Sequence, residues 1–93
     1  MADIEIPDDV IAAQRAYDAA DARVHEIVAS LPSSVAIVAG EAEISDEQRQ
    51  AWHEARAERM RLLFALRDLP WWGEQPDPLG AEKALRKAAR AGA

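Results

Sequence analysis

Residues 45–73 read SDEQRQAWHEARAERMRLLFALRDLPWWG, and this stretch decides the fold. It begins with a capping box, S-D-E-Q at residues 45–48, in which the serine and glutamine side chains satisfy free amides at a helix start. It closes at P-W-W-G, residues 70–73, where proline and glycine interrupt the helical pattern. Between these two signals we predict a long helix over about residues 46–69.

A second long helix is predicted upstream, over about residues 8–31. Apolar side chains recur there at alternating spacings of four and three residues, the pattern of a helix packed along its length on another helix. The series is Ile6, Val10, Ala13, Tyr17, Ala20, Val24, Ile27 and Leu31. A proline followed by two aspartates starts this helix, and Pro32 ends it. Residues 1–7 are predicted to form an extended arm.

The two long helices are predicted to form an antiparallel hairpin, because the linker between them is short. Folding the two apolar seams together places Arg59 opposite the small side chain of Ala20. Asp21 then lies within reach of the guanidinium group. We therefore predict a structural pair between Asp21 and Arg59.

The linker, residues 32–45, can be interpreted in two ways. Its β-branched residues between Val35 and Val38 favour a short strand. A serine cap at Ser33 or Ser34, with Gly40 after the last turn, favours a helical turn instead. A lone strand has no visible partner in an otherwise helical chain, so we predict the helical turn or a compact loop.

The C-terminal segment differs in charge from the rest of the chain. The formal net charge is −6, yet the basic tail, residues 81–93, has a single acid beside Lys83, Arg86, Lys87 and Arg90. Three prolines and two glycines predict an irregular turn over residues 70–80. A short basic helix is predicted over about residues 81–91, with so little apolar surface that it frays. An acidic partner or a phosphate backbone could bind this tail, but we favour contact with the chain's own acidic body.

Composition excludes several classes of function. A chain of 93 residues is predicted to be one all-α domain, residues 1–93, and it has no cysteine for disulfides, thiolate metal sites or thiol nucleophiles. The N-terminus lacks the apolar core of a signal peptide, and no apolar run is long enough to span a membrane. We expect a cytoplasmic protein without a membrane partner. The acidic hairpin is expected to repel nucleic acid.

Candidate catalytic and metal-binding patterns are incomplete. Histidine–glutamate pairs at residues 25–26 and 53–54 begin the zinc motif H-E-x-x-H, but alanine stands where each second histidine is required. Asp18, Asp21 and His25 share a helical face and could hold a divalent metal, although a closed site needs a ligand from another element. We therefore predict no metal, no cofactor and no catalytic residue.

Four large apolar side chains are candidates for an interaction surface. Met60 and Phe64 lie one turn apart, off the predicted seam, so the tryptophan turn, the third helix or a second subunit must cover them. Trp71 and Trp72 either cap the open end of the hairpin or form an exposed aromatic anchor. We expect one ring mainly buried and the other partly exposed.

These residues predict a non-enzymatic interaction module that binds another protein or associates with itself. Self-association would join two hairpins in a four-helix bundle, as a homodimer. Two alternatives stay open: an acidic mimic of DNA that occupies a DNA-binding protein, and a metal-dependent helical enzyme acting through Asp18, Asp21 and His25.

Both ends of the chain carry a resemblance to known proteins. The opening MADIEIPDD, residues 1–9, and the ending over residues 83–93 are similar to short uncharacterised helical proteins of actinomycetes. Such proteins are often encoded on integrative elements. The resemblance implies an accessory role in a mobile element and no particular activity.

Overall fold

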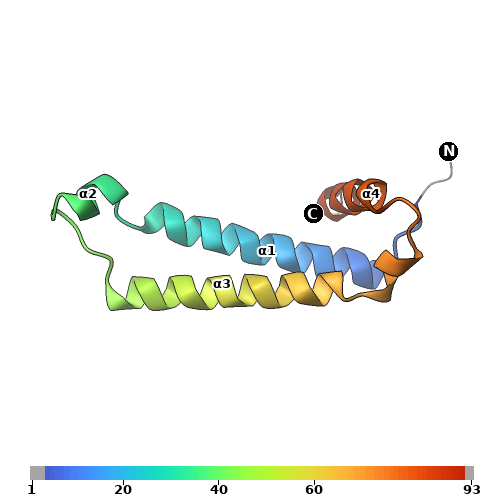
Figure 1. The fold of residues 1–93 in the computed structure, drawn as a ribbon, viewed down its shortest axis with the longest axis horizontal. Helices are drawn as coiled ribbons and strands as arrows, with labels where there is room; N and C mark the ends of the chain where they lie inside the picture. The colour runs from blue at the N-terminus through green and yellow to red at the C-terminus, as the bar shows by residue number, and fades with distance from the viewer. Residues whose placement is uncertain (1–3, 92–93) are drawn as a thin grey trace.

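The computed structural model describes residues 4–91, and throughout that range the chain is all-α, without a strand. The elements are α1 (Asp8–Ser30), α2 (Ser34–Val38), α3 (Asp46–Arg67), the 3-10 turn η1 (Pro70–Glu74) and α4 (Pro78–Ala91). Helices α1 and α3 run antiparallel and side by side, with α2 at the turn between them (Figure 1). The predicted hairpin and C-terminal helix are confirmed. The first three residues of the predicted arm lie outside the described range, and residues 4–7 contain no helix.

Local signals account for the helix starts. At α3 the Ser45 hydroxyl accepts from the Gln48 amide at 3.0 Å, and the Gln48 side chain accepts from the Ser45 amide at 2.9 Å, completing the predicted capping box. At α2 the Ser33 hydroxyl accepts from the Ala36 amide. Gly40 follows α2 with a φ of +75°, a conformation that disfavours other residues. The helical interpretation of the linker is therefore confirmed.

The register of the hairpin matches the predicted pair. Arg59 Nη1 donates to Asp21 Oδ1 at 3.0 Å, across the interface between α3 and α1. Val24 and Ile27 of α1 are buried on the same side of that helix. Because both charged side chains are about one-third exposed, the pair contributes no more than about 1 kcal/mol and acts mainly as a marker of register.

The prediction of an irregular turn over residues 70–80 was wrong at its end, over residues 78–80. Residues 70–74 form η1, and α4 begins at Pro78, three residues earlier than expected. Proline suits the first turn of a helix because its missing amide would lack a partner there. Asp77 caps the start: its carboxylate accepts from the Gly80 amide at 3.2 Å and its carbonyl from the Ala81 amide at 2.9 Å.

The C-terminal helix has a packing surface on the hairpin, and its fraying stays a prediction. Helix α4 packs on the N-terminal half of α1 (Figure 1) and buries Ala81, Leu85 and Ala89. The two alanines let the helices approach closely, so one leucine with small neighbours is enough for docking. The main core lies at this end of the molecule and contains Val10, Leu66, Trp71, Ala81 and Leu85.

The molecule is elongated. Its extents are 57 × 22 × 21 Å and its radius of gyration is 17.5 Å, against about 12 Å for a compact domain of this length. The half of the hairpin next to α2 consists of α1 and α3 alone (Figure 1). The chain exposes 6847 Å², whereas a compact monomer of its mass exposes roughly 5,300 Å². The elongated chain therefore exposes part of the surface that a compact fold of the same mass would bury.

Candidate interaction surface

The two tryptophans of η1 cap the open end of the hairpin. Trp71 is 5% exposed, and its indole N–H donates to the Glu5 carbonyl at 3.1 Å. Trp72 is partly buried, and its N–H donates to the Leu66 carbonyl at 2.8 Å. The rings meet edge to face with centroids 4.9 Å apart. The expected division into one buried and one partly exposed ring is confirmed, and Trp71 is too deeply buried to serve as an exposed anchor.

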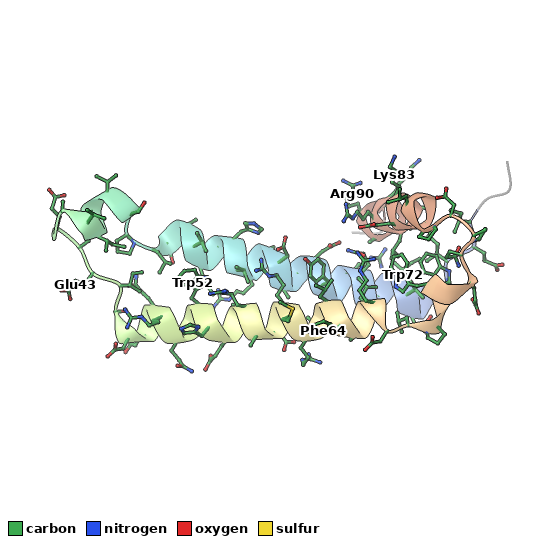
Figure 2. All side chains as sticks on the ribbon, in the orientation of Figure 1. Glu43, Trp52, Phe64, Trp72, Lys83 and Arg90 are labelled. Carbon is green, nitrogen blue, oxygen red and sulfur yellow. The ribbon has the colours of Figure 1, made fainter. Side chains whose placement is uncertain are left out.

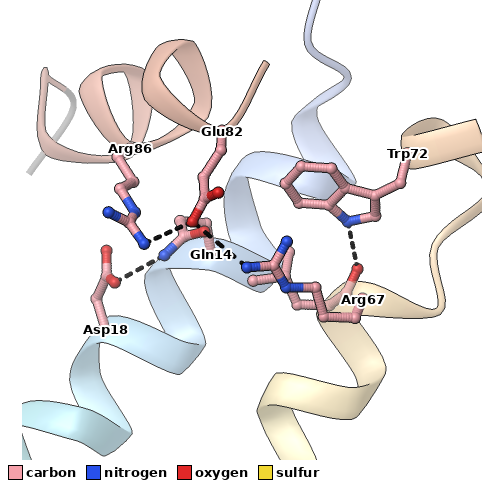
Figure 3. A network of polar contacts seen from close by, with 7 residues as sticks. Gln14, Asp18, Arg67, Trp72, Glu82 and Arg86 are labelled. Carbon is pink, nitrogen blue, oxygen red and sulfur yellow. Dashed lines mark hydrogen bonds and ion pairs between the residues drawn. The ribbon is translucent and has the colours of Figure 1, made fainter. Parts of the chain in front are cut away.

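A polar network joins η1, α3 and α4 (Figure 3). The Arg67 guanidinium lies 4.9 Å from the centre of the Trp72 ring, and its Nη2 lies 3.4 Å from Glu82 Oε1. The same carboxylate oxygen accepts from Arg86 Nη2 at 2.6 Å. An ion pair between α3 and α4 therefore uses a cation of the hairpin and the acid of the tail, the reverse of the predicted arrangement.

The basic residues of α4 lie mostly at the surface. Arg86 and Arg90 line a shallow hollow of about 300 Å³ together with Asp18 of α1, so two tail cations lie near one acid of the body. Lys83 points away from the hairpin (Figure 2), and Lys87 is exposed. Two of the four tail cations thus lie near Asp18 of the body, and the other two face solvent.

A hydrogen bond within α1 satisfies a buried amide on the side chain of Gln14. Gln14, 5% exposed, donates through Nε2 to Asp18 Oδ1 at 2.8 Å (Figure 3). The next residue, Arg15, donates through Nε to the Ala89 carbonyl at 3.0 Å, near the end of α4. This second bond joins α1 to α4 and helps to fix where α4 lies, because α4 supplies its acceptor.

The candidate metal ligands are committed to other partners. Asp18 accepts from Gln14 and Asp21 from Arg59, while His25 Nδ1 lies 2.8 Å from the Asp21 backbone carbonyl oxygen and 3.5 Å from Asp21 Oδ2. Across residues 4–91 no three metal-ligating side chains gather in a group that could hold an ion. The geometry therefore gives the metal-dependent enzyme no support.

An outer seam of α3 faces away from α1. It consists of His53, Ala57, Met60 and Phe64, spaced by four, three and four residues, and all four are exposed. Met60 is 50% and Phe64 59% exposed, so within the described chain neither η1 nor α4 covers them. Sequence reasoning found the two large residues but missed the regular spacing, which was visible in the sequence as a second heptad series.

A second apolar surface lies at the hairpin tip. Val35 and Val38 of α2 are 79% and 89% exposed, and Ile37 is 36% exposed. With Ser34 and Ala39 the two valines line an open hollow of about 400 Å³. From the sequence these residues were predicted to form a strand or a helical turn, and their exposure as a surface was not predicted. Their β-branched run was the available signal.

The edge of the outer seam carries a perturbed carboxyl. Hydrogen bonds from Arg61, and secondarily its charge, lower the pKa of Glu58 below the ordinary range. The pair therefore stabilises the helix above the ordinary pKa of glutamate, and this contribution is lost as the pH falls through the lowered value. In a carbon-detected NMR titration, Arg61→Gln should raise the pKa of Glu58. An identical midpoint in wild type and variant would contradict the assigned cause.

These features define a class of protein: a small, elongated all-α protein with a helical hairpin, a docked basic helix and exposed apolar surfaces. None of the helices within residues 4–91 has the length and apolarity needed to cross a membrane. The chain belongs to the family described as a domain of unknown function, DUF8825, whose model matches residues 9–88. The comparison with curated proteins gives no match, and the comparison with solved structures gives none either. The family match covers the outer seam, the tryptophan turn and most of α4.

Proposed function

We propose that this protein is a non-enzymatic protein–protein interaction module that binds through the outer seam of α3. The observation that carries the proposal is the seam itself: Met60 and Phe64 stand half exposed on a helix whose opposite face already packs on α1. A helix with apolar stripes on two faces is typical of one that packs between two neighbours. Because each side chain is already about half buried, covering the rest would contribute about 1–2 kcal/mol each, roughly half of the value for a fully exposed side chain.

The shape of the molecule supports the proposal. Beyond the core that contains Trp71 and Leu85, the hairpin has only two helices, each with one side exposed to solvent. An isolated helix pair buries little of each helix, and small domains depend on added packing for stability. A partner along α3 would supply a third layer where residues 4–91 supply none.

The acidic mimic of DNA fits the structure less well. Such a mimic needs a continuous face of unpaired carboxylates. Here several acids of the hairpin lie beside arginines: Asp21 with Arg59, Glu26 with Arg23, Asp46 with Arg49, and Glu58 with Arg61. Pairing reduces the negative potential that a DNA-binding protein would meet. The interaction module is therefore the function we favour.

Affinity capture with paired variants tests the proposal. The full chain, immobilised by its C-terminus, should retain protein partners, copies of itself included, from an extract of the cells that produce it. Met60→Glu/Phe64→Glu should reduce that retention at least tenfold, because two charges would enter an apolar contact. Val35→Glu/Val38→Glu is the matched control, since it places the same two charges on two apolar residues of the tip that are even more exposed.

Each outcome has a definite meaning. Loss of capture in the seam variant alone supports the outer seam as the binding surface. Loss in the tip variant alone would move the function to α2 and contradict the proposal. Circular dichroism of both variants should show unchanged helix content, since the substituted side chains are exposed.

The remaining expectations concern the setting in which the module works. Similarity of the chain ends to short helical proteins of actinomycetes supports an accessory role on an integrative element. A cytoplasmic location fits that role, and a protein partner or a second copy of the chain is the corresponding ligand. We propose no cofactor.

A further inference from the structure

We infer that the occupant of the outer seam is a second copy of this chain, docked antiparallel with α3 against α3. The inference rests on the proposed function and adds the identity and orientation of the partner. It would give a homodimer with a two-fold axis between Ala57 and Met60, near the middle of α3. Each contact in such a pair occurs twice.

The spacing of the seam suits this arrangement. In the antiparallel register Ala57 lies opposite Met60 of the second copy, and His53 lies opposite Phe64 of the second copy. A small residue faces a large one in the central layers, as interdigitation of two helices requires. The series of four, three and four residues keeps all four positions on one stripe over three turns.

Charges beside the seam favour the antiparallel orientation. Glu54 and Arg61 are seven residues apart and so lie on the same edge of the seam, whereas Arg56 and Leu63 lie on the other edge. In an antiparallel helix pair, like edges meet. Glu54 then faces Arg61 of the second copy, twice, and the aliphatic stem of Arg56 faces Leu63.

The parallel orientation is less complementary. In a parallel pair opposite edges meet, so Arg56 would face Arg61 of the second copy and the two cations would repel each other. Only the attraction between Arg49 and Glu54 of the second copy would offset this repulsion. The antiparallel pair does bring Glu47 near Asp68 of the second copy. Those carboxylates lie beyond the ends of the seam, where both are exposed and solvent screens them.

The exposed area is large enough for a dimer. The chain exposes about 1,500 Å² more than a compact monomer of its mass. A standard stable interface removes about 800 Å² from each partner. The excess over the whole chain is therefore larger than the area that a standard interface removes from one partner.

Sedimentation across a hundredfold concentration range tests the inference. Wild type should be a dimer that dissociates on dilution. Glu54→Arg and Arg61→Glu should each weaken dimerisation about tenfold, because every substitution acts at two equivalent sites, and the double exchange should restore it. In a parallel dimer Arg61→Glu would instead strengthen association. The control is Arg23→Glu/Glu26→Arg, a charge exchange in an exposed pair on α1, away from the outer seam.

Cross-linking tests the orientation independently, because the chain has no native cysteine. A mixture of His53→Cys and Phe64→Cys chains should form mainly the mixed disulfide on oxidation. In the antiparallel register, two copies of His53 are separated by eleven residues of helix, roughly 16 Å, which exceeds disulfide reach. A dominant disulfide between two His53→Cys chains would overturn the inference.

The outcomes separate this inference from the function on which it rests. A monomer at every concentration, with capture still dependent on Met60 and Phe64, overturns self-docking and leaves the interaction module standing. A dimer insensitive to all seam substitutions also overturns the inference, since another surface then makes the contact. Loss of both dimerisation and seam-dependent capture overturns both proposals.

Discussion

Replacing Trp71 with alanine is expected to lower the free energy of unfolding by about 3–5 kcal/mol, the range for a large aromatic side chain removed from a core. The ring is 5% exposed and lies in the cluster with Val10, Leu66 and Leu85. A domain of this length has a total stability of about 5–14 kcal/mol. The substitution should therefore remove a large share of the stability.

A second substitution separates packing from hydrogen bonding. Trp71→Phe keeps an aromatic ring but removes the N–H that donates to the Glu5 carbonyl. It should cost about 1–2 kcal/mol, less than alanine, because Glu5 is exposed and water can satisfy its carbonyl. Urea unfolding followed by circular dichroism measures both values without depending on the lost fluorophore. An alanine variant within 1 kcal/mol of wild type would contradict the assigned core.

The second large effect is expected in α4. Leu85 is fully buried where α4 meets α1, so Leu85→Ala should lower the free energy of unfolding by about 2–5 kcal/mol. The matched control is Leu79→Ala on the same helix. Leu79 is 73% exposed, and its replacement should change stability by no more than about 0.5 kcal/mol. Urea unfolding curves of the two variants give the comparison directly.

The comparison between the two leucines tests the docking of α4. Equal and small effects would mean that α4 contributes little to the fold, and that the buried position of Leu85 is not maintained in solution. A large effect at Leu85 alone supports a docked helix. Because Leu85 and Trp71 share one cluster, their double variant should lose less than the sum of the single losses.

The hairpin could be predicted because its signals are local. The capping box at Ser45 and the proline after Leu31 define helix ends by hydrogen bonding and steric exclusion, with no need for tertiary information. The pair between Asp21 and Arg59 followed from counting turns along two apolar seams. That prediction used only helix geometry and the shortness of the linker.

The placement of α4 could not be derived in the same way. Ala81 and Ala89 contribute little apolar area, so their burial depends on close contact with α1 and not on a strong hydrophobic pattern. The start at Pro78 depends on the Asp77 cap, which was obscured by the number of prolines nearby. Periodicity predicts which residues share a helix face, but it does not predict which faces pack against another element.

The same limit applies to the candidate site. Trp71 and Trp72 were equally plausible as anchors from sequence, and only the path of η1 buries the first and leaves the second partly covered. The outer seam was predicted in its two large residues, whereas the tip patch of Val35 and Val38 was missed. A β-branched run indicates a strand or a core by default, and its exposure here depends on where α2 sits.

The one-sided position of the core gives the molecule a gradient of local stability along its length. Near Trp71 four elements meet, and opening any of them exposes shared apolar surface. Near Gly40 the backbone of α2 is held by a single helical turn and its caps. Amide hydrogens should therefore exchange slowly at one end and quickly at the other. The tip can adjust its shape during an encounter while the tryptophan end keeps the two long helices in register.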